Sequence, residues 1–132
     1  MVTFSGINHL AVVIAAVAAW LASSLWYLSL PKPYAAALGK APIQAFGVYV
    51  FAFVADLIIA WVLAGLLGHL GPGQVTLRNG VISGAFMWFG FVLTTMAVNY
   101  AFSGRDRRLL LIDAGNWLVV LLVAGAVIGL FG

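Results

Sequence analysis

The chain has 132 residues, of which 65% are hydrophobic, and only six basic and three acidic side chains serve its whole length. Soluble domains carry about a quarter charged residues, so this composition excludes a water-soluble surface, and its high hydrophobicity excludes disorder. We expect one integral membrane domain covering residues 1–132. The net charge of +3 is best explained by loop charges rather than by a nucleic-acid partner, and the lack of cysteine excludes disulfides and thiolate metal sites.

Four apolar runs are each long enough to cross a bilayer as a helix, which takes about 20 residues. They cover approximately residues 10–30, 43–67, 81–102 and 109–131. Proline and glycine interrupt the chain between the first three runs, and Ser103-Gly104-Arg105-Asp106 separates the last two. The predicted fold class is therefore all-α, a transmembrane four-helix bundle with both termini on the same side of the membrane.

The basic residues predict which side that is. The first and third loops share one side and hold five of the six: Lys32, Lys40, Arg105, Arg107 and Arg108. The second loop holds only Arg78. Because basic loops remain in the cytoplasm, we expect both termini on the non-cytoplasmic side.

Asp56 lies near the middle of the second run, among Phe, Val, Ala, Leu and Ile. An ionisable residue at that depth is costly and marks a functional site by default. No lysine or arginine lies inside a run to pair with it. One interpretation is a proton or cation site; the other is a neutral carboxylic acid that joins helices, for example through Thr94 or Thr95.

A second polar group is expected in the cytoplasmic half of the bundle. Asp106 is placed to cap the fourth helix, which puts Asp113 about two turns inside it, with Asn116 on the same face. Asn99, near the end of the third run, reaches a similar depth. Trp26 and Tyr27 approach that level from the first run. These side chains predict either a polar pocket for a ligand or ion, or a structural contact in which Asp113 pairs with an arginine of the third loop.

Other features point less specifically to a function. His9 and His69 fall on the outer side, where contacts with head groups or helix caps are the preferred interpretation and ligation of a metal or haem iron is the alternative. Gly80-x-x-x-Gly84 and Gly125-x-x-x-Gly129 fit the pattern of closely packed membrane helices, within one chain or between subunits. The loops contain no catalytic constellation, so we predict neither an enzyme nor a cofactor.

Four segments together resemble domain-of-unknown-function family 1761, a group of small, mostly bacterial four-span membrane proteins. The resemblance covers essentially the whole chain and rests on Asn8-His9-Leu10-Ala11-Val12, Leu25-Trp26-Tyr27, Asn99-Tyr100-Ala101-Phe102 and Leu111-Ile112-Asp113-Ala114-Gly115-Asn116-Trp117. It implies four spans and marks Asp113, Asn99, Trp26 and Tyr27 as signature positions. It implies no reaction.

Two functions are compatible with these observations. The first is a small oligomeric membrane protein with a cytoplasm-facing polar site for an ion or small molecule. The second is a structural or accessory subunit of a larger membrane complex. In both cases we expect a multi-pass protein of the bacterial inner membrane, in contact with lipid and assembled as a homo-oligomer or with other subunits, and without a nucleic-acid partner.

Overall fold

Helices account for most of the computed structural model, which describes residues 6–132 and contains no strand within them. In chain order the elements are α1 (His9–Leu28), α2 (Pro31–Leu38), α3 (Phe46–His69), α4 (Leu77–Met87), η2 (Trp88–Leu93), α5 (Thr94–Ser103) and α6 (Arg107–Phe131). Because α4, η2 and α5 run on without a break, there are four helices long and apolar enough to cross a membrane. The predicted all-helical, multi-pass character is confirmed.

Local side-chain contacts explain where the helices begin and end. The Asn8 side chain accepts a hydrogen bond from the Ala11 amide at the start of α1, and Thr76 accepts one from Asn79 at the start of α4. Asp106 accepts one from the Arg108 amide, so its predicted role as the cap of α6 is confirmed. Its carboxylate also pairs with the Arg108 guanidinium at 2.7 Å, and these hydrogen bonds hold the pKa of Asp106 below its usual value.

The first predicted break contains a helix that the sequence analysis treated as a loop. Residues Pro31–Leu38 form α2, which ends at Gly39 in the left-handed conformation with φ 77°. Proline suits the first turn of a helix because its missing N–H would have no partner there. The alanines that follow favour a helix and the glycine ends it. This break therefore carries a short structured element on one end of the bundle.

The third spanning helix contains a π-helical segment, η2, in its middle. A π-helical turn disturbs the regular i→i+4 pattern, and in hydrocarbon every backbone carbonyl still needs a donor. The hydroxyls of Thr94 and Thr95 donate to the carbonyls of Gly90 and Phe91, at 2.8 and 2.6 Å. The two threonines thus serve the backbone of their own helix and are not the predicted partners of Asp56.

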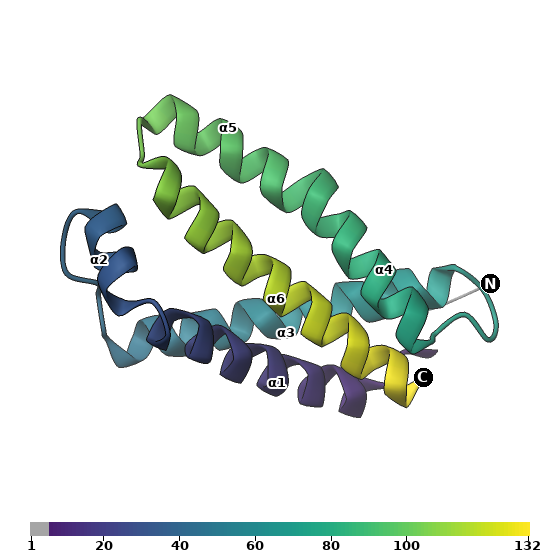
Figure 1. Ribbon diagram of the computed structural model, residues 1–132. Coiled ribbons are helices and arrows are strands. Elements are labelled where there is room, and N and C mark those ends of the chain that lie inside the picture. The colour runs from purple at the N-terminus through teal and green to yellow at the C-terminus, as the bar shows by residue number, and fades with distance from the viewer. Residues whose placement is uncertain (1–5) are drawn as a thin grey trace.

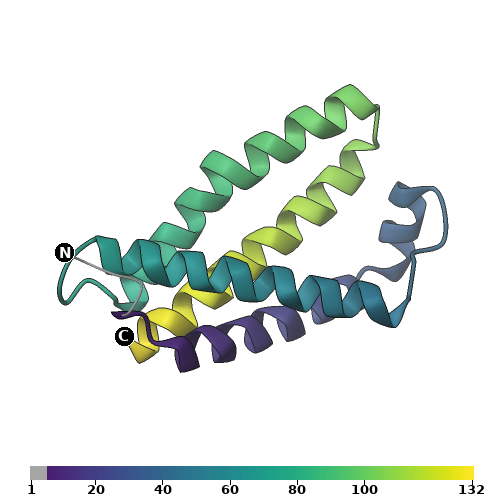
Figure 2. The same cartoon turned by 180° about the vertical axis from the view of Figure 1, so that it is seen from behind.

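The four spanning helices form two antiparallel pairs, α1 with α3 and the α4–α5 helix with α6 (Figure 1). The pairs meet at the end where the described chain starts and finishes, since Gly6 and Gly132 line the same pocket. They diverge towards the opposite end, where α2 lies between them and contacts α6 (Figure 2). The fourth helix, α6, touches every other helix and is the centre of the fold.

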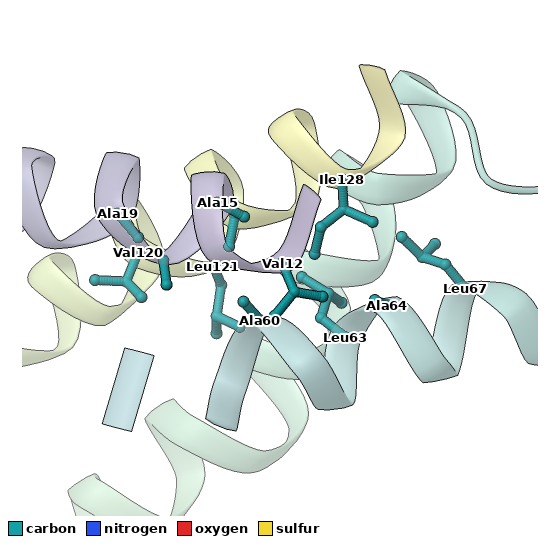
Figure 3. Close-up of a cluster of buried hydrophobic side chains, with 12 residues drawn as sticks. Val12, Ala15, Ala19, Ala60, Leu63, Ala64, Leu67, Val120, Leu121 and Ile128 are labelled. Carbon is teal, nitrogen blue, oxygen red and sulfur yellow. The ribbon is translucent and has the colours of Figure 1, made fainter. Parts of the chain in front are cut away.

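Small side chains allow the helices to pack closely at their crossing. Ala15, Ala16 and Ala19 of α1 are fully buried, and they face leucine, valine and isoleucine side chains from α3 and α6 (Figure 3). Gly80 of α4 and Gly125 of α6 lie so close that a Cβ on either one would overlap the carbonyl of the other. The two glycine motifs therefore pack against each other within the chain, which resolves the alternative that the sequence left open.

Candidate functional site

Asp113 forms the centre of a polar group at the end of the bundle where the helix pairs diverge. One carboxylate oxygen accepts a hydrogen bond from the Tyr27 hydroxyl of α1 at 2.6 Å, and the other accepts one from the Tyr100 hydroxyl of α5 at 2.5 Å. Hydrogen bonds to an ionised acceptor are short and about twice as strong as neutral ones. One carboxylate therefore joins three spanning helices.

Two tryptophans hold the backbone of α6 on either side of Asp113. The Trp26 indole N–H donates to the carbonyl of Ile112 at 2.9 Å, and the Trp88 indole N–H donates to that of Ala114 at 2.7 Å. Next to them, a Cβ at Gly115 would collide with the Trp26 ring. The tryptophans and the glycine thus fix the rotation and depth of α6, and with them the direction of the Asp113 side chain.

Aromatic and cationic side chains surround this centre. Tyr34, on α2, packs against the Tyr27 ring with 4.8 Å between ring centroids. Burial, and then the nearby charge of Asp113, raise the pKa of the Tyr34 phenol. Arg105 lies over the face of Tyr100, with its guanidinium carbon 5.0 Å from the ring centroid. The side chain of Asp113 is thus approached by three tyrosines.

No arginine pairs with Asp113 among residues 6–132, contrary to the structural alternative drawn from the sequence. Arg108 pairs with Asp106, Arg105 stacks on Tyr100, and Arg107 is exposed. The physical reason is position: Asp113 lies about two turns along α6 from the loop, whereas the capping carboxylate of Asp106 is only two residues from Arg108 and within its reach. Within residues 6–132, the hydrogen-bond donors to the Asp113 side chain are two tyrosine hydroxyls.

The structure separates the two asparagines of the predicted site. Asn116 is buried, 4% exposed, and its side-chain oxygen accepts a hydrogen bond from the Ser23 hydroxyl of α1 at 2.5 Å. Asn99 is exposed and lies with Thr94, Thr95 and Val98 on an open face of the third spanning helix. Asn116 therefore contributes a hydrogen bond to the contact between α1 and α6, whereas Asn99 faces away from that contact.

Asp56 is placed apart from Asp113. It is 3% exposed in α3 and belongs to the helix face that carries Ala60, Leu63, Ala64 and Leu67 into the core. Its carboxyl makes no hydrogen bond or ion pair with any residue in the range 6–132. The two acids that the sequence singled out thus occupy different surroundings: one accepts two hydrogen bonds, the other has no partner there.

His9 and His69 offer no visible metal site. Both side chains are exposed, at the first residue of α1 and the last residue of α3. Within the described part of the chain no cluster of three or more histidines or acids could hold a metal ion.

Tyr100 and Tyr34 are the site residues that sequence reasoning missed. From the sequence, Tyr100 stands out only as part of a signature segment, and Tyr34 is not singled out. The sequence signal for Tyr100 was its place beside Asn99 in one of the signature segments. Tyr34 could be assigned to the site only once the position of α2 was known.

Comparison with known proteins identifies the family and no more. Neither a curated protein nor a solved structure matches the chain. The model of a family described as a protein of unknown function, DUF1761, matches residues 10–129. Its range includes every residue of the Asp113 group, from Trp26 and Tyr27 to Asn116. The chain is a member of the DUF1761 family.

Proposed function

We propose that this protein binds a cation at Asp113, on the cytoplasmic side of the inner membrane. The observation that carries the proposal is the pairing of the Asp113 carboxylate with two tyrosine hydroxyls and with no basic side chain. A carboxylate has about four acceptor positions, so two remain after Tyr27 and Tyr100 have donated. The hydroxyls orient the carboxyl group, and no basic side chain of residues 6–132 forms an ion pair with it.

The surrounding side chains favour an organic ammonium ion over a metal ion. Metal ions such as Mg²⁺ and Ca²⁺ prefer several oxygen ligands, and Asp113 is the only carboxylate of this group. Aromatic faces attract organic cations through the ring quadrupole, and Tyr27, Tyr34 and Tyr100 stand next to the carboxylate. Arg105 already lies on Tyr100, which supports the suitability of that ring for a cation.

The cytoplasmic placement of this site rests on the basic loops. Lys32 lies in the first turn of α2, Lys40 follows that helix, and three arginines lie at or just before the start of α6, all at the end where Asp113 lies. Basic loops are retained on the cytoplasmic side. A ligand would accordingly reach Asp113 from the cytoplasm.

The test is binding by the purified protein in detergent or nanodiscs. We expect tetramethylammonium or choline to raise the thermal unfolding midpoint of the unaltered protein, because a ligand that binds only the folded state stabilises it. Asp113→Asn removes the charge and should abolish that rise, while Asp106→Asn, which alters an acid outside the site, should preserve it. An equal rise in Asp113→Asn, or none in the unaltered protein with either organic cation or with Na⁺, K⁺ or Mg²⁺, rejects the proposal.

The second candidate function is that of a packing subunit in a larger assembly. The third spanning helix, Leu77–Ser103, has 6% of its most apolar window buried within the chain, against 28% to 44% for the other three. This open side leaves room for a neighbouring helix, from a second copy or another protein. Native mass measurement after gentle solubilisation decides the point: a monomer, with lipid as its only companion, excludes this candidate.

A further inference from the structure

A polar side chain, Asn99, faces outward from the third spanning helix. Its neighbour Tyr100 turns inward and donates a hydrogen bond to α6. Asn99 is exposed and shares an open hollow with Thr94, Thr95 and Val98. Helix α5, which carries these residues, packs against α6 and lies at the edge of the molecule (Figure 1). This face of the chain therefore meets lipid or another protein.

Asn99 lies at a depth where lipid offers no hydrogen bond. The third spanning helix, Leu77–Ser103, has 27 residues and is about 40 Å long at about 1.5 Å per residue. Its midpoint is Gly90, and Asn99 lies about 14 Å further along the helix. The hydrocarbon layer is about 30 Å thick, so a helix centred in the bilayer keeps this amide just inside the hydrocarbon, and tilting moves it deeper.

The amide of Asn99 has no partner within the described chain. The Ser103 hydroxyl donates to its backbone carbonyl, and no group in residues 6–132 forms a hydrogen bond with its side chain. The hydroxyls of Thr94 and Thr95 donate to carbonyls of their own helix. A primary amide carries one acceptor oxygen and two N–H donors, and leaving them unpaired in hydrocarbon is costly. A polar partner at the same depth removes that cost.

A second copy of the chain supplies such a partner. Copies inserted in the same orientation are related by a two-fold axis along the membrane normal, so a residue on that axis meets its own equivalent at the same depth. Two asparagine amides placed in this way satisfy each other, because the N–H of each donates to the carbonyl of the other. Paired asparagines fix the register of parallel two-stranded coiled coils by the same contact.

The side chains around Asn99 have the spacing of a seam between two helices. Phe91, Thr95, Val98 and Phe102 are exposed and follow each other at intervals of four, three and four residues, as expected for such a seam. Phe91 and Phe102 are 67% and 91% exposed, and the small Thr95 between them lets two backbones approach. The same helix has 6% of its most apolar window buried within the chain, so the seam is free to pack against a neighbour.

We propose that the face formed by Phe91, Thr95, Val98, Asn99 and Phe102 is the contact of a homodimer, in which the two Asn99 side chains form hydrogen bonds with each other across the two-fold axis. The contact gives the second candidate function a defined partner, a second copy of this chain. It does not depend on the proposed cation binding.

The strength of association is measured in liposomes by energy transfer between donor and acceptor dyes on the single cysteine of Pro72→Cys, over a range of protein-to-lipid ratios. We expect a dimer whose dissociation constant rises about tenfold in Asn99→Leu, because interhelical hydrogen bonds contribute about that factor. Asn99→Gln, which keeps an amide, should restore most of the association. Ile58→Leu, at an exposed position of α3, is the matched control and should change nothing.

Cross-linking locates the contact on the helix. Because the chain has no cysteine, each single-cysteine variant reports on one position, and copper phenanthroline with oxygen oxidises two neighbouring thiols to a disulfide. We expect cross-linked dimers of Val98→Cys and Phe102→Cys and none of Ile58→Cys. The thermal shift with tetramethylammonium should persist in Asn99→Leu, which separates this result from the cation proposal.

Three results overturn the proposed homodimer: a monomer at every protein-to-lipid ratio, an association that Asn99→Leu leaves unchanged, or a dimer that cross-links at neither Val98→Cys nor Phe102→Cys. A different polypeptide that co-purifies in fixed proportion and cross-links to Val98→Cys overturns it as well, because this face then belongs to another partner.

Discussion

At the scale of single residues, the two spanning acids lie in unlike surroundings. Asp113 accepts hydrogen bonds from two phenols, one on α1 and one on α5. Asp56 lies on the buried face of α3 and makes no hydrogen bond or ion pair with the residues that the structure describes. Both acids were recognised in the sequence because carboxyl groups are scarce in a bilayer. Their partners were not, since contacts between helices depend on how each helix is rotated.

The hydroxyl of Tyr27 should contribute measurably to stability. Tyr27→Phe removes one donor to the Asp113 carboxylate, and hydrogen bonds to charged groups are worth about 1.5–3 kcal/mol. We expect a lower free energy of unfolding by roughly that amount, measured by denaturant or thermal unfolding in detergent. Tyr34→Phe is the matched control, since the Tyr34 hydroxyl makes no hydrogen bond in residues 6–132 and its ring contact is retained. Equal losses in the two variants would show that the hydrogen bond contributes nothing.

At the scale of elements, α6 gains its position from close backbone contact with α4 and from the tryptophans of α1 and η2. The glycine motifs were visible in the sequence, but a motif of this kind is compatible with contacts inside a chain or between chains. The structure selects the first because Gly80 and Gly125 face each other. Helix α2 was missed because two prolines were weighted as breakers, although a proline at the first helical position is favourable.

Adding one methyl group at the α4–α6 contact should destabilise the fold. A Cβ at Gly80 meets the backbone carbonyl of Gly125, which cannot rotate away. Overpacking of this kind costs about 1–3 kcal/mol, so Gly80→Ala should lower the thermal unfolding midpoint. Gly90→Ala, on the same spanning helix with nothing within 4 Å of its added Cβ, should leave the midpoint unchanged or raise it. A midpoint for Gly80→Ala that equals that of Gly90→Ala contradicts the close contact.

At the scale of the whole molecule, the distribution of charge and the course of the helices together give the protein two unlike ends. One end carries the termini, His9 and His69; the other carries α2, the three arginines and the Asp113 group. Because consecutive spanning helices run antiparallel, successive loops lie at alternate ends of the molecule, and recognising the spans is enough to assign each group to its end. Which end faces the cytoplasm is decided at membrane insertion, and the basic loops predict that it is the end with α2 and the three arginines.

The natural absence of cysteine makes the orientation directly measurable. Ala41→Cys lies after α2, and Pro72→Cys lies between α3 and α4; both positions are exposed. With an impermeant maleimide applied to intact spheroplasts, we expect labelling of Pro72→Cys at once and of Ala41→Cys only after permeabilisation. The reverse pattern would place the Asp113 group on the outer face and would refute its proposed access from the cytoplasm.

The sequence by itself determined that the chain is helical, contains four segments long and apolar enough to cross a membrane and belongs to its family, because length, hydropathy, caps and signature segments act locally along the chain. It also marked Asp113, Asn116, Trp26 and Tyr27, which the structure brings to one contact between α1 and α6. Only the tertiary structure decided that Asn99 turns away, that Tyr34 and Tyr100 join Asp113, and that Asp56 lies on the buried face of α3. The physical reason is that spanning helices are apolar on all sides, so hydrophobic periodicity does not show which face is inward. That choice is made by close packing of small residues such as Ala15, Gly80 and Gly125.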